Sequence, residues 1–329
     1  MTRVARAALG LGLGLAPLGV GVAQTPREVR AARVEVSPGA VVWFAGGETR
    51  VGADQVALDH AITLCRRDLR ALAELLGEPR ESSGLRLRAR LLLTVCLDQP
   101  VPEVCAPSLF AREIGARPVW LSPFGLDRTE VTVDAYARCV RAGVCADPLD
   151  APGTPHTGAA ELPVTGVRWG DAVTYCAWIG ARLPTDAEWE HAARGREGRP
   201  FPWGFQWDPG RANHGAIAPG CRSDDDGHAL AAPVGSFPDG ATPEGVLDLA
   251  GNVQEWVFDR AERDAREPFG ELAVNPRGPA LGGERVTRGG AYNTPAWALR
   301  TTWRGAFGNG ERRRDTGFRC AWDPHRRGP

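Results

Sequence analysis

From residue 117 to the C-terminus, glycine, proline and tryptophan interrupt the chain so often that few long periodic elements can form. The chain has 11 Trp but only 3 Tyr among its 329 residues. Large rings bury much surface per residue, so they suit a core assembled from short segments and irregular loops. We therefore predict a domain with little regular secondary structure.

The N-terminal third of the chain has a different pattern. Apolar residues recur at helical spacing over residues 55–95, and Gly77 and Pro79 interrupt them. This spacing predicts a helical stretch with a loop inside it. Further upstream, apolar and polar residues alternate from Val34 to Phe44 until Gly46 breaks the run. That alternation predicts a β-hairpin at the start of the domain.

Start and stop signals predict three shorter helices over residues 132–143, 170–180 and 185–195. Each predicted helix ends at a glycine, a residue that tolerates the left-handed conformation common at helix C-termini. The third helix has the clearest start, because Thr185 and Glu188 match a capping box. In that motif each side chain accepts a hydrogen bond from the backbone N–H of the other residue.

The N-terminus resembles a secretory signal. Two arginines precede an apolar run over residues 7–22, and a small-x-small cleavage pattern ends at Ala23. These features predict a signal peptide over residues 1–23. The alternative is a transmembrane anchor, which needs about 20 apolar residues; this run is shorter and contains Pro17. No later segment is apolar enough to span a bilayer, so we expect residues 24–329 to be exported, either periplasmic or secreted.

The net charge and the cysteine content indicate which classes of partner and which cellular compartment to expect. The formal net charge of -1 gives no electrostatic reason to expect a nucleic-acid partner. The 8 Cys of an exported chain predict disulfide bonds, and none of them lies in a CxxC zinc pattern. Cys139 and Cys145 flank the end of a predicted helix, where they could meet.

Five segments carry a resemblance to a known family. They are Phe124–Tyr136 (FGLDRTEVTVDAY), Leu162–Gly195, Phe201–Gly204 (FPWG), Gly245–Val257 (GVLDLAGNVQEWV) and Arg285–Ala321. Their order and spacing resemble the formylglycine-generating enzyme (sulfatase-modifying factor) family over roughly residues 32–322. The resemblance implies an α+β fold, a variant of the C-type-lectin fold, in a single domain with a helical insertion at about residues 55–110. It also implies descent from an oxidoreductase.

The resemblance implies a disulfide bond between Cys176 and Cys320. Closing such a long loop stabilises the fold by about 4–5 kcal/mol in the chain-entropy model. Three pairings stay open for the other four cysteines, which are Cys65, Cys96, Cys105 and Cys221. Among them we favour a bond from Cys65 to Cys96 or to Cys105.

Two calcium sites are also implied by the resemblance. Calcium is a hard cation that prefers carboxylate, amide and carbonyl oxygens. The first set comprises the side chains of Asn213 and Asp226 and the carbonyls of His214 and His228. The second set comprises the side chains of Asp248 and Glu255 and the carbonyls of Gly251 and Val253. The alternative for each set is a solvated acidic turn.

The copper centre of the family is not preserved in the sequence. The family's oxidase binds copper(I) through two cysteine thiolates, which are soft ligands that suit this ion. The matching positions are Thr294 and Leu299. Three neighbouring positions also depart from the family: Ala291 replaces a serine, Gln254 a tryptophan and Asp315 an asparagine. We therefore expect neither copper binding nor formylglycine formation.

The positions around the altered copper centre predict a pocket for a peptide or small ligand. Its residues are Gln254, Ala291, Asn293, Thr294, Trp297, Leu299 and Asp315. We predict an exported binding or interaction module. Two alternatives stay open: an oxidoreductase with altered metal-dependent chemistry, and an active formylglycine-generating enzyme whose thiols come from elsewhere, such as Cys221.

Overall fold

A computed structural model describes residues 40–80, 82–97, 100–149, 160–217, 221, 223–261 and 272–324. The predicted signal peptide and the first part of the predicted hairpin lie outside these ranges. Within them, no helix combines the length and the apolar character needed to cross a membrane.

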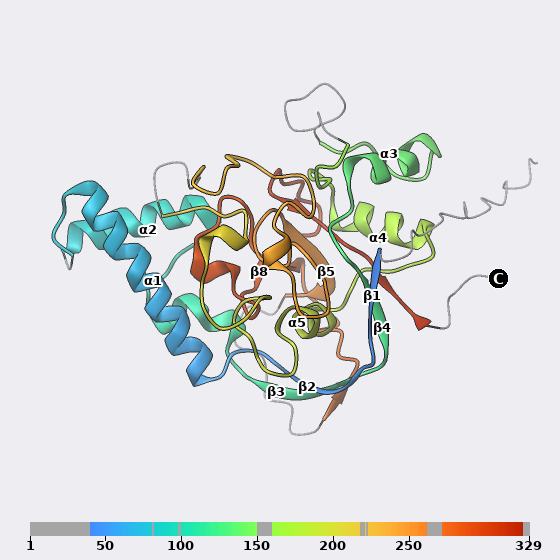
Figure 1. The fold of residues 1–329 in the computed structure, drawn as a ribbon, viewed down its shortest axis with the longest axis horizontal. Helices are drawn as coiled ribbons and strands as arrows, with labels where there is room; N and C mark the ends of the chain where they lie inside the picture. Colours follow the sequence, from blue (N-terminus) through green and yellow to red (C-terminus); the bar gives the residue numbers. More distant parts are fainter. Residues whose placement is uncertain are drawn as a thin grey trace, which may run out of the picture. The chain divides into compact units, whose positions relative to one another are not determined.

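The first of three short sheets joins segments from both ends of the described chain (Figure 1). It has the order β1-β4-β10, with β1 at Val41–Phe44, β4 at Phe124–Asp127 and β10 at Ala321–Trp322. Both outer strands are antiparallel to β4. The Asp127 carboxylate accepts a hydrogen bond from the Trp322 indole at 2.7 Å, which fixes the C-terminal strand to the centre of the sheet.

The second sheet has the order β2-β3-β6, with β2 at Gly47–Val51, β3 at Arg117–Leu121 and β6 at Ala273–Val274. Although β1 and β2 are consecutive, each pairs with a strand of a different sheet, so these two strands do not form a hairpin with each other. Gly46 lies between them with φ 72°. A Cβ there would lie 2.4 Å from the Leu121 carbonyl oxygen, so glycine allows the chain to pass from one sheet into the other.

The third sheet lies in the middle of Figure 1 and has the order β8-β7-β5-β9. Its strands are β5 at Gln254–Arg260, β7 at Glu284–Arg288, β8 at Gly305–Gly308 and β9 at Thr316–Gly317. β5 is antiparallel to β7 but parallel to β9. This arrangement brings the residue before β9 next to the start of β5.

The three predicted short helices are present close to their predicted bounds. They are α3 at Val133–Arg141, α4 at Trp169–Trp178 and α5 at Asp186–Arg194. The capping box at α5 is confirmed: the Thr185 hydroxyl accepts from the Glu188 N–H at 3.2 Å, and the Glu188 carboxylate accepts from the Thr185 N–H at 2.8 Å. α5 is buried along its length and contacts β2, β3, β5 and β7.

The predicted helical stretch forms two helices that lie together at the left of Figure 1. They are α1 at Gln55–Leu76 and α2 at Ser83–Leu97, and we refer to residues 55–97 as the α1–α2 hairpin. Asp54 caps α1 by accepting from the Ala57 N–H at 3.0 Å, and Gly77 ends it in the left-handed conformation.

Short 3-10 helices lie between the other elements of the described chain. They are η1 at Pro107–Glu113, η2 at Pro209–Arg211, η3 at Pro238–Gly240 and η4 at Ala296–Leu299. α1 contacts both η1 and η4. A single hydrophobic cluster contains apolar residues of α1, α2, η1 and η4, so the hairpin shares its core with the chain that follows it.

All eight cysteines form disulfide bonds. The pairs are Cys65–Cys105, Cys96–Cys221, Cys139–Cys145 and Cys176–Cys320. The last two are the pairs expected from the sequence, and Cys105 is one of the two partners favoured for Cys65. The bond from Cys96 to Cys221 ties α2 to a segment that lies far beyond it in the sequence.

Candidate functional site

The predicted pocket residues come from the start of β5, the turn after β7 and the residue before β9. The parallel pairing of β5 and β9 places Gln254 beside Asp315, and the Gln254 N–H donates to the Asp315 carbonyl at 2.8 Å. From the turn after β7, the Asn293 side-chain amide donates to the Asp315 carboxylate at 3.2 Å. Three distant segments thus meet in one polar cluster.

The Asp315 carboxylate is the charged centre of this cluster. The Arg313 guanidinium donates to both of its oxygens, at 3.1 and 2.9 Å, and the Thr316 hydroxyl donates at 3.0 Å. Arg313 also lies over the Phe307 ring, 3.9 Å from the centroid. Asp315 is only 6% exposed, whereas Asn293 is half-buried, so the amide is the member of the cluster that solvent can reach.

Thr294 occupies one of the two positions expected to carry copper ligands in the family. Its hydroxyl accepts a hydrogen bond from the Ala291 N–H at 2.9 Å, and its own N–H donates to the Ala291 carbonyl at 2.9 Å. The side chain is 2% exposed. The hydroxyl therefore stabilises a tight turn inside the fold.

Two of the predicted pocket residues do not line an open pocket. Leu299 is fully buried in a small apolar cluster with Ala212 and Ala250. Trp297 is also fully buried and packs edge-on against Phe110, with ring centroids 5.6 Å apart. Both residues belong to η4, and Trp297 lies in the hydrophobic core shared with the α1–α2 hairpin. The pocket assignment of these two buried side chains is therefore corrected.

The first predicted calcium set is drawn together in space. The Asp226 carboxylate accepts from the His214 N–H at 2.7 Å and from the His228 N–H at 2.9 Å. Next to His214, the Asn213 amide nitrogen donates to Asn252 at 3.2 Å. Among the described residues, nothing donates a hydrogen bond to the buried Oδ1 of Asn213. An unsatisfied buried carbonyl oxygen is costly, and a hard cation would satisfy it.

The second predicted set is only partly drawn together. Asp248 accepts from the Gly235 N–H at 2.6 Å at the start of the glycine turn. Glu255, by contrast, is fully buried and already occupied: the Arg319 guanidinium donates to its two oxygens at 2.7 and 2.8 Å, and the Trp189 indole donates at 2.8 Å. The structure thus places Glu255 in a buried ion pair.

Sequence reasoning missed Glu130, which lies beside Asp248. Glu130 is 2% exposed, and its Oε1 accepts from the Asn252 amide at 3.1 Å. Its Oε2 has no hydrogen-bond partner among the described residues. Burial raises the pKa of Glu130 well above its ordinary value, and the charge of Asp248 raises it further. Burial also raises the pKa of Asp248. A cation near both carboxyls would stabilise their charged forms and lower both pKa values.

The first of these two places has one carboxylate, that of Asp226, and the second has two, those of Asp248 and Glu130. Across the described residues, no group of three or more His, Cys, Asp or Glu side chains is arranged to hold a metal ion. A calcium ion at either place therefore needs amide and backbone carbonyl oxygens as well, which agrees with its ordinary ligand preference. In the sequence, the only signal for Glu130 as a site residue is that it is the acidic residue of the RTEVT segment.

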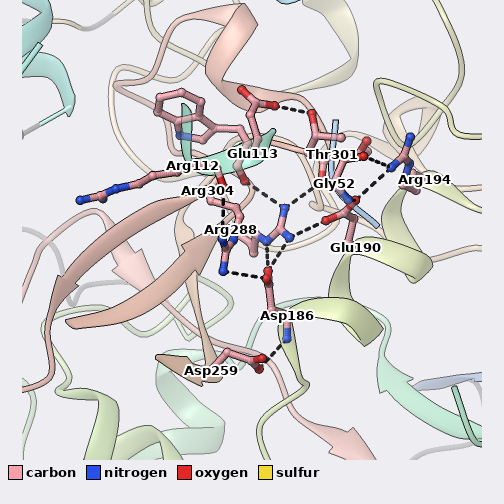
Figure 2. Close-up of polar contacts among 12 residues, drawn as sticks. Gly52, Arg112, Glu113, Asp186, Glu190, Arg194, Asp259, Arg288, Thr301 and Arg304 are labelled. Atoms are coloured by element: carbon pink, nitrogen blue, oxygen red, sulfur yellow. Dashed lines mark hydrogen bonds and ion pairs between the residues drawn. The ribbon is translucent and has the colours of Figure 1, made fainter. Parts of the chain in front are cut away.

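A buried ion-pair network joins β7 to α5 (Figure 2). Arg288, at the end of β7, is fully buried and pairs with Asp186 and with Glu190 of α5, the latter at 2.6 Å. Arg304 joins Asp186 at 3.0 Å, and Arg194 joins Glu190 at 3.0 Å. The network fixes β7 against α5 and so sets where the turn after β7 begins.

The family follows from a comparison of the whole sequence with known domains. The Sulfatase-modifying factor enzyme 1-like domain matches residues 103–324. The chain belongs to this family. Both helices of the α1–α2 hairpin precede the matched residues in this sulfatase-modifying factor family member.

Relatives include active and inactive proteins by name. The formylglycine-generating enzyme of Mus musculus is 37% identical over 171 residues, covering 49% of this chain and 44% of that protein. A second Mus musculus protein, named inactive C-alpha-formylglycine-generating enzyme 2, is 44% identical over 121 residues, covering 35% of this chain and 39% of that protein. The family member described here spans about half the length of the curated relatives it matches.

A solved structure supports the fold. PvdO from Pseudomonas aeruginosa matches with a TM-score of 0.56 and 22% identity, over 86% of this chain and 94% of PvdO. The mixed α+β fold of the formylglycine-generating enzymes, related to the C-type lectins, is therefore the fold of this family member, as the sequence predicted.

Proposed function

We propose that this sulfatase-modifying factor family member is an exported, calcium-stabilised binding module that does not generate formylglycine. The observation that carries the proposal is that all eight cysteines form disulfides while Thr294 and Leu299 occupy the expected copper positions. Copper(I) favours thiolate ligands. A hydroxyl that closes a turn and a buried isobutyl group supply none, and Cys221 is bonded to Cys96.

The accessible part of the polar cluster suits a peptide. Asn293 presents an amide, which both donates and accepts hydrogen bonds, and Asp315 behind it is neutralised by Arg313. A peptide backbone offers the same alternation of donors and acceptors. Asn293 lies in the turn after β7, the strand that the buried network of Figure 2 joins to α5. Loops on a rigid frame are where binding residues concentrate. A relative named as inactive supports a role for this domain without catalysis.

Calcium would stabilise the loops between η2 and β5. In the first site it would be held by the Asn213 and Asp226 side chains, with the carbonyls of His214 and His228. In the second it would be held by Asp248 and Glu130, with the carbonyls of Gly251 and Val253. The unsatisfied oxygens of Asn213 and Glu130 support these assignments. Export is supported by the four disulfides, since such bonds persist in oxidising compartments.

The test is an aerobic assay of the mature protein, disulfides intact, with added copper and a peptide that carries the CxPxR-type sulfatase signature. Mass spectrometry follows the peptide cysteine, and an established formylglycine-generating enzyme serves as the positive control. We expect no conversion. Formation of formylglycine would refute the proposal and would favour an active enzyme.

Binding is measured in parallel by fluorescence anisotropy with the same labelled peptide. We expect Asn293→Ala to weaken peptide binding, while Asn309→Ala, at an exposed position outside the polar cluster, leaves it unchanged. Equal effects of the two substitutions would contradict a binding site at the polar cluster. A redox-active metal retained through purification, together with turnover of a thiol substrate, would favour altered oxidoreductase chemistry instead.

A further inference from the structure

A cavity of about 370 Å³ lies between α1, α2 and residues 103–107. Volumes of about 300–1,000 Å³ are typical of small-ligand sites. The disulfide from Cys65 to Cys105 holds the 103–107 segment against α1, so the wall is covalently fixed. The cavity lies outside the polar cluster and outside both candidate calcium sites, and its interpretation is independent of the proposed function.

The cavity combines apolar walls with two cationic side chains. Ile62, Leu69, Val104 and Pro107 supply the apolar surface. Arg66 of α1 and Arg86 of α2 line the same space. Because the two arginines come from different helices, the cavity depends on how the α1–α2 hairpin folds.

Arg66 and Arg86 differ from the neighbouring arginines of the hairpin, which form ion pairs. Arg67 pairs with Asp68 at 3.2 Å, and Arg88 pairs with Glu78 at 3.3 Å. Within the part of the chain that the structure describes, the guanidinium groups of Arg66 and Arg86 make neither an ion pair nor a hydrogen bond. Among the described arginines of the α1–α2 hairpin, Arg66 and Arg86 are thus the two whose guanidinium groups contact no described partner, and both line the cavity.

The charge of the lining selects the class of ligand. Arg66, Arg86 and Glu103 together give the cavity a formal charge of about +1 at neutral pH. Guanidinium groups bind carboxylates through paired, charge-assisted hydrogen bonds. Glu103 would repel a second negative charge, which disfavours a phosphate dianion. The apolar walls match an aliphatic group attached to the carboxylate.

We propose that this cavity binds a monoanionic carboxylate carried on an apolar group. Two sources share this chemistry: a fatty acid, and a peptide that ends in an apolar residue with a free C-terminus. In both, the carboxylate pairs with Arg66 and Arg86 while the apolar part lies against Ile62 and Leu69.

The test is isothermal titration calorimetry on the full mature chain at neutral pH. Decanoate and a short peptide ending in free leucine are the two probes. Their uncharged counterparts, decanamide and the same peptide with a C-terminal amide, are the neutral controls, and inorganic phosphate is the apolar-free anion. We expect one or both carboxylates to bind, and the neutral forms and phosphate to bind at least about tenfold more weakly. The probe that binds identifies the source.

Two double variants locate the site. Arg66→Ala with Arg86→Ala is expected to weaken carboxylate binding at least about tenfold, because it removes both cavity cations. Arg67→Ala with Arg88→Ala removes the same charge from the same two helices and is expected to leave the affinity unchanged. Circular dichroism checks that both variants keep their helices.

Three outcomes would overturn the proposal. They are equal losses in the two double variants, binding of the amides as tightly as the acids, and no binding of either carboxylate. Preferential binding of phosphate would also overturn it, since that result would indicate a site for a compact multivalent anion.

Discussion

The α1–α2 hairpin and the sheet-bearing part of the molecule differ in where their ion pairs lie, which is at the surface in the hairpin and in the interior around the sheets. Around the sheets, Arg288, Arg300 and Arg319 are at most 1% exposed, and each pairs with a buried carboxylate from a distant segment. In the hairpin, the ion pair between Arg80 and Glu74 has side chains that are 64% and 66% exposed. Two disulfides attach the hairpin to later segments.

This difference shows how two regions of one chain can reach stability by different routes. Exposed ion pairs contribute little to stability because water screens them, whereas a buried pair that loses one partner leaves an uncompensated charge. We therefore expect the hairpin to depend on apolar packing and covalent bonds. The sheet-bearing part, which has short strands and few long helices, depends on its internal ion pairs.

The largest expected effect comes from removing the bond between Cys96 and Cys221. The bond spans 125 residues, and in the chain-entropy model its loss costs up to about 5 kcal/mol. We expect Cys96→Ala with Cys221→Ala to lower the free energy of unfolding and to raise amide hydrogen exchange in α2 more than in β5. Chemical denaturation and hydrogen-exchange mass spectrometry measure the two effects.

The matched control is Cys139→Ala with Cys145→Ala, whose bond spans only 6 residues. The same model assigns it about 2 kcal/mol. If the short-loop variant lost as much stability as the long-loop variant, or if exchange rose equally in α2 and β5, the hairpin would not depend on this bond as we infer.

The next effect tests the buried ion pairs around the sheets. Arg288→Ala leaves Asp186 and Glu190 buried without their shared cation, and we expect a loss of about 3–5 kcal/mol in the free energy of unfolding. Arg80→Ala, which breaks the exposed pair with Glu74 in the hairpin, should cost less than about 1 kcal/mol. Urea denaturation of both variants measures the two losses in the free energy of unfolding. Losses of similar size would contradict the distinction between the two regions.

Calcium should stabilise the sheet-bearing part and leave the stability of the hairpin largely unchanged. Calcium at a hundred times its dissociation constant stabilises a one-site protein by about 2.7 kcal/mol, so a chelator should lower the thermal midpoint. We expect Asp226→Asn to reduce this calcium dependence, because Asp226 bonds to the backbone of His214 and His228. Asp225→Asn, at the neighbouring exposed acid, is the control. A chelator with no effect on the wild-type protein would contradict both proposed sites.

A smaller effect concerns the pH dependence of the first sheet. Burial raises the pKa of Asp127 to about 6. A carboxyl whose pKa is raised in the folded state binds its proton more tightly there than in the unfolded chain. Its contribution to stability is therefore full at low pH and is lost as the pH rises through about 6.

This linkage predicts a measurable difference between two pH values. The protein should gain about 1 kcal/mol from Asp127 on going from pH 7 to about pH 5. Denaturation at the two pH values measures the gain, and Asp127→Asn should remove it even if the variant is less stable overall. An unchanged pH difference in the variant would assign the effect to other groups.

Local signals in the sequence predicted the helices well. The start of α5 follows from Thr185 and Glu188 because both hydrogen bonds of a capping box lie within four residues. The periodic apolar residues of α1 and the helix-ending Gly77 are equally local. Helical hydrogen bonds join residues four apart, so the residues that decide a helix are its own.

The candidate site was predicted less completely because its contacts join distant segments. The sequence contains Glu255 within a turn that resembles a calcium motif, but it does not reveal that Arg319 reaches the same carboxylate. Glu130 was missed because it becomes a candidate ligand only through its position beside Asp248, which lies more than a hundred residues away in the sequence. Trp297 and Leu299 were assigned to a pocket because the sequence does not show their distant packing partners. Trp297 packs against Phe110 in the core shared with α1, and Leu299 packs against Ala212 and Ala250.

The sequence by itself determined the helices, the glycine-rich turns and the family. These features depend on residue identity and on hydrogen bonds within one turn of the chain. Only the tertiary structure decided which strands share a sheet, which cysteine bonds to Cys221, and which oxygens of Asn213 and Glu130 are buried without a partner. Those features depend on long-range packing, where many pairings satisfy the same local pattern and only the complete core selects one.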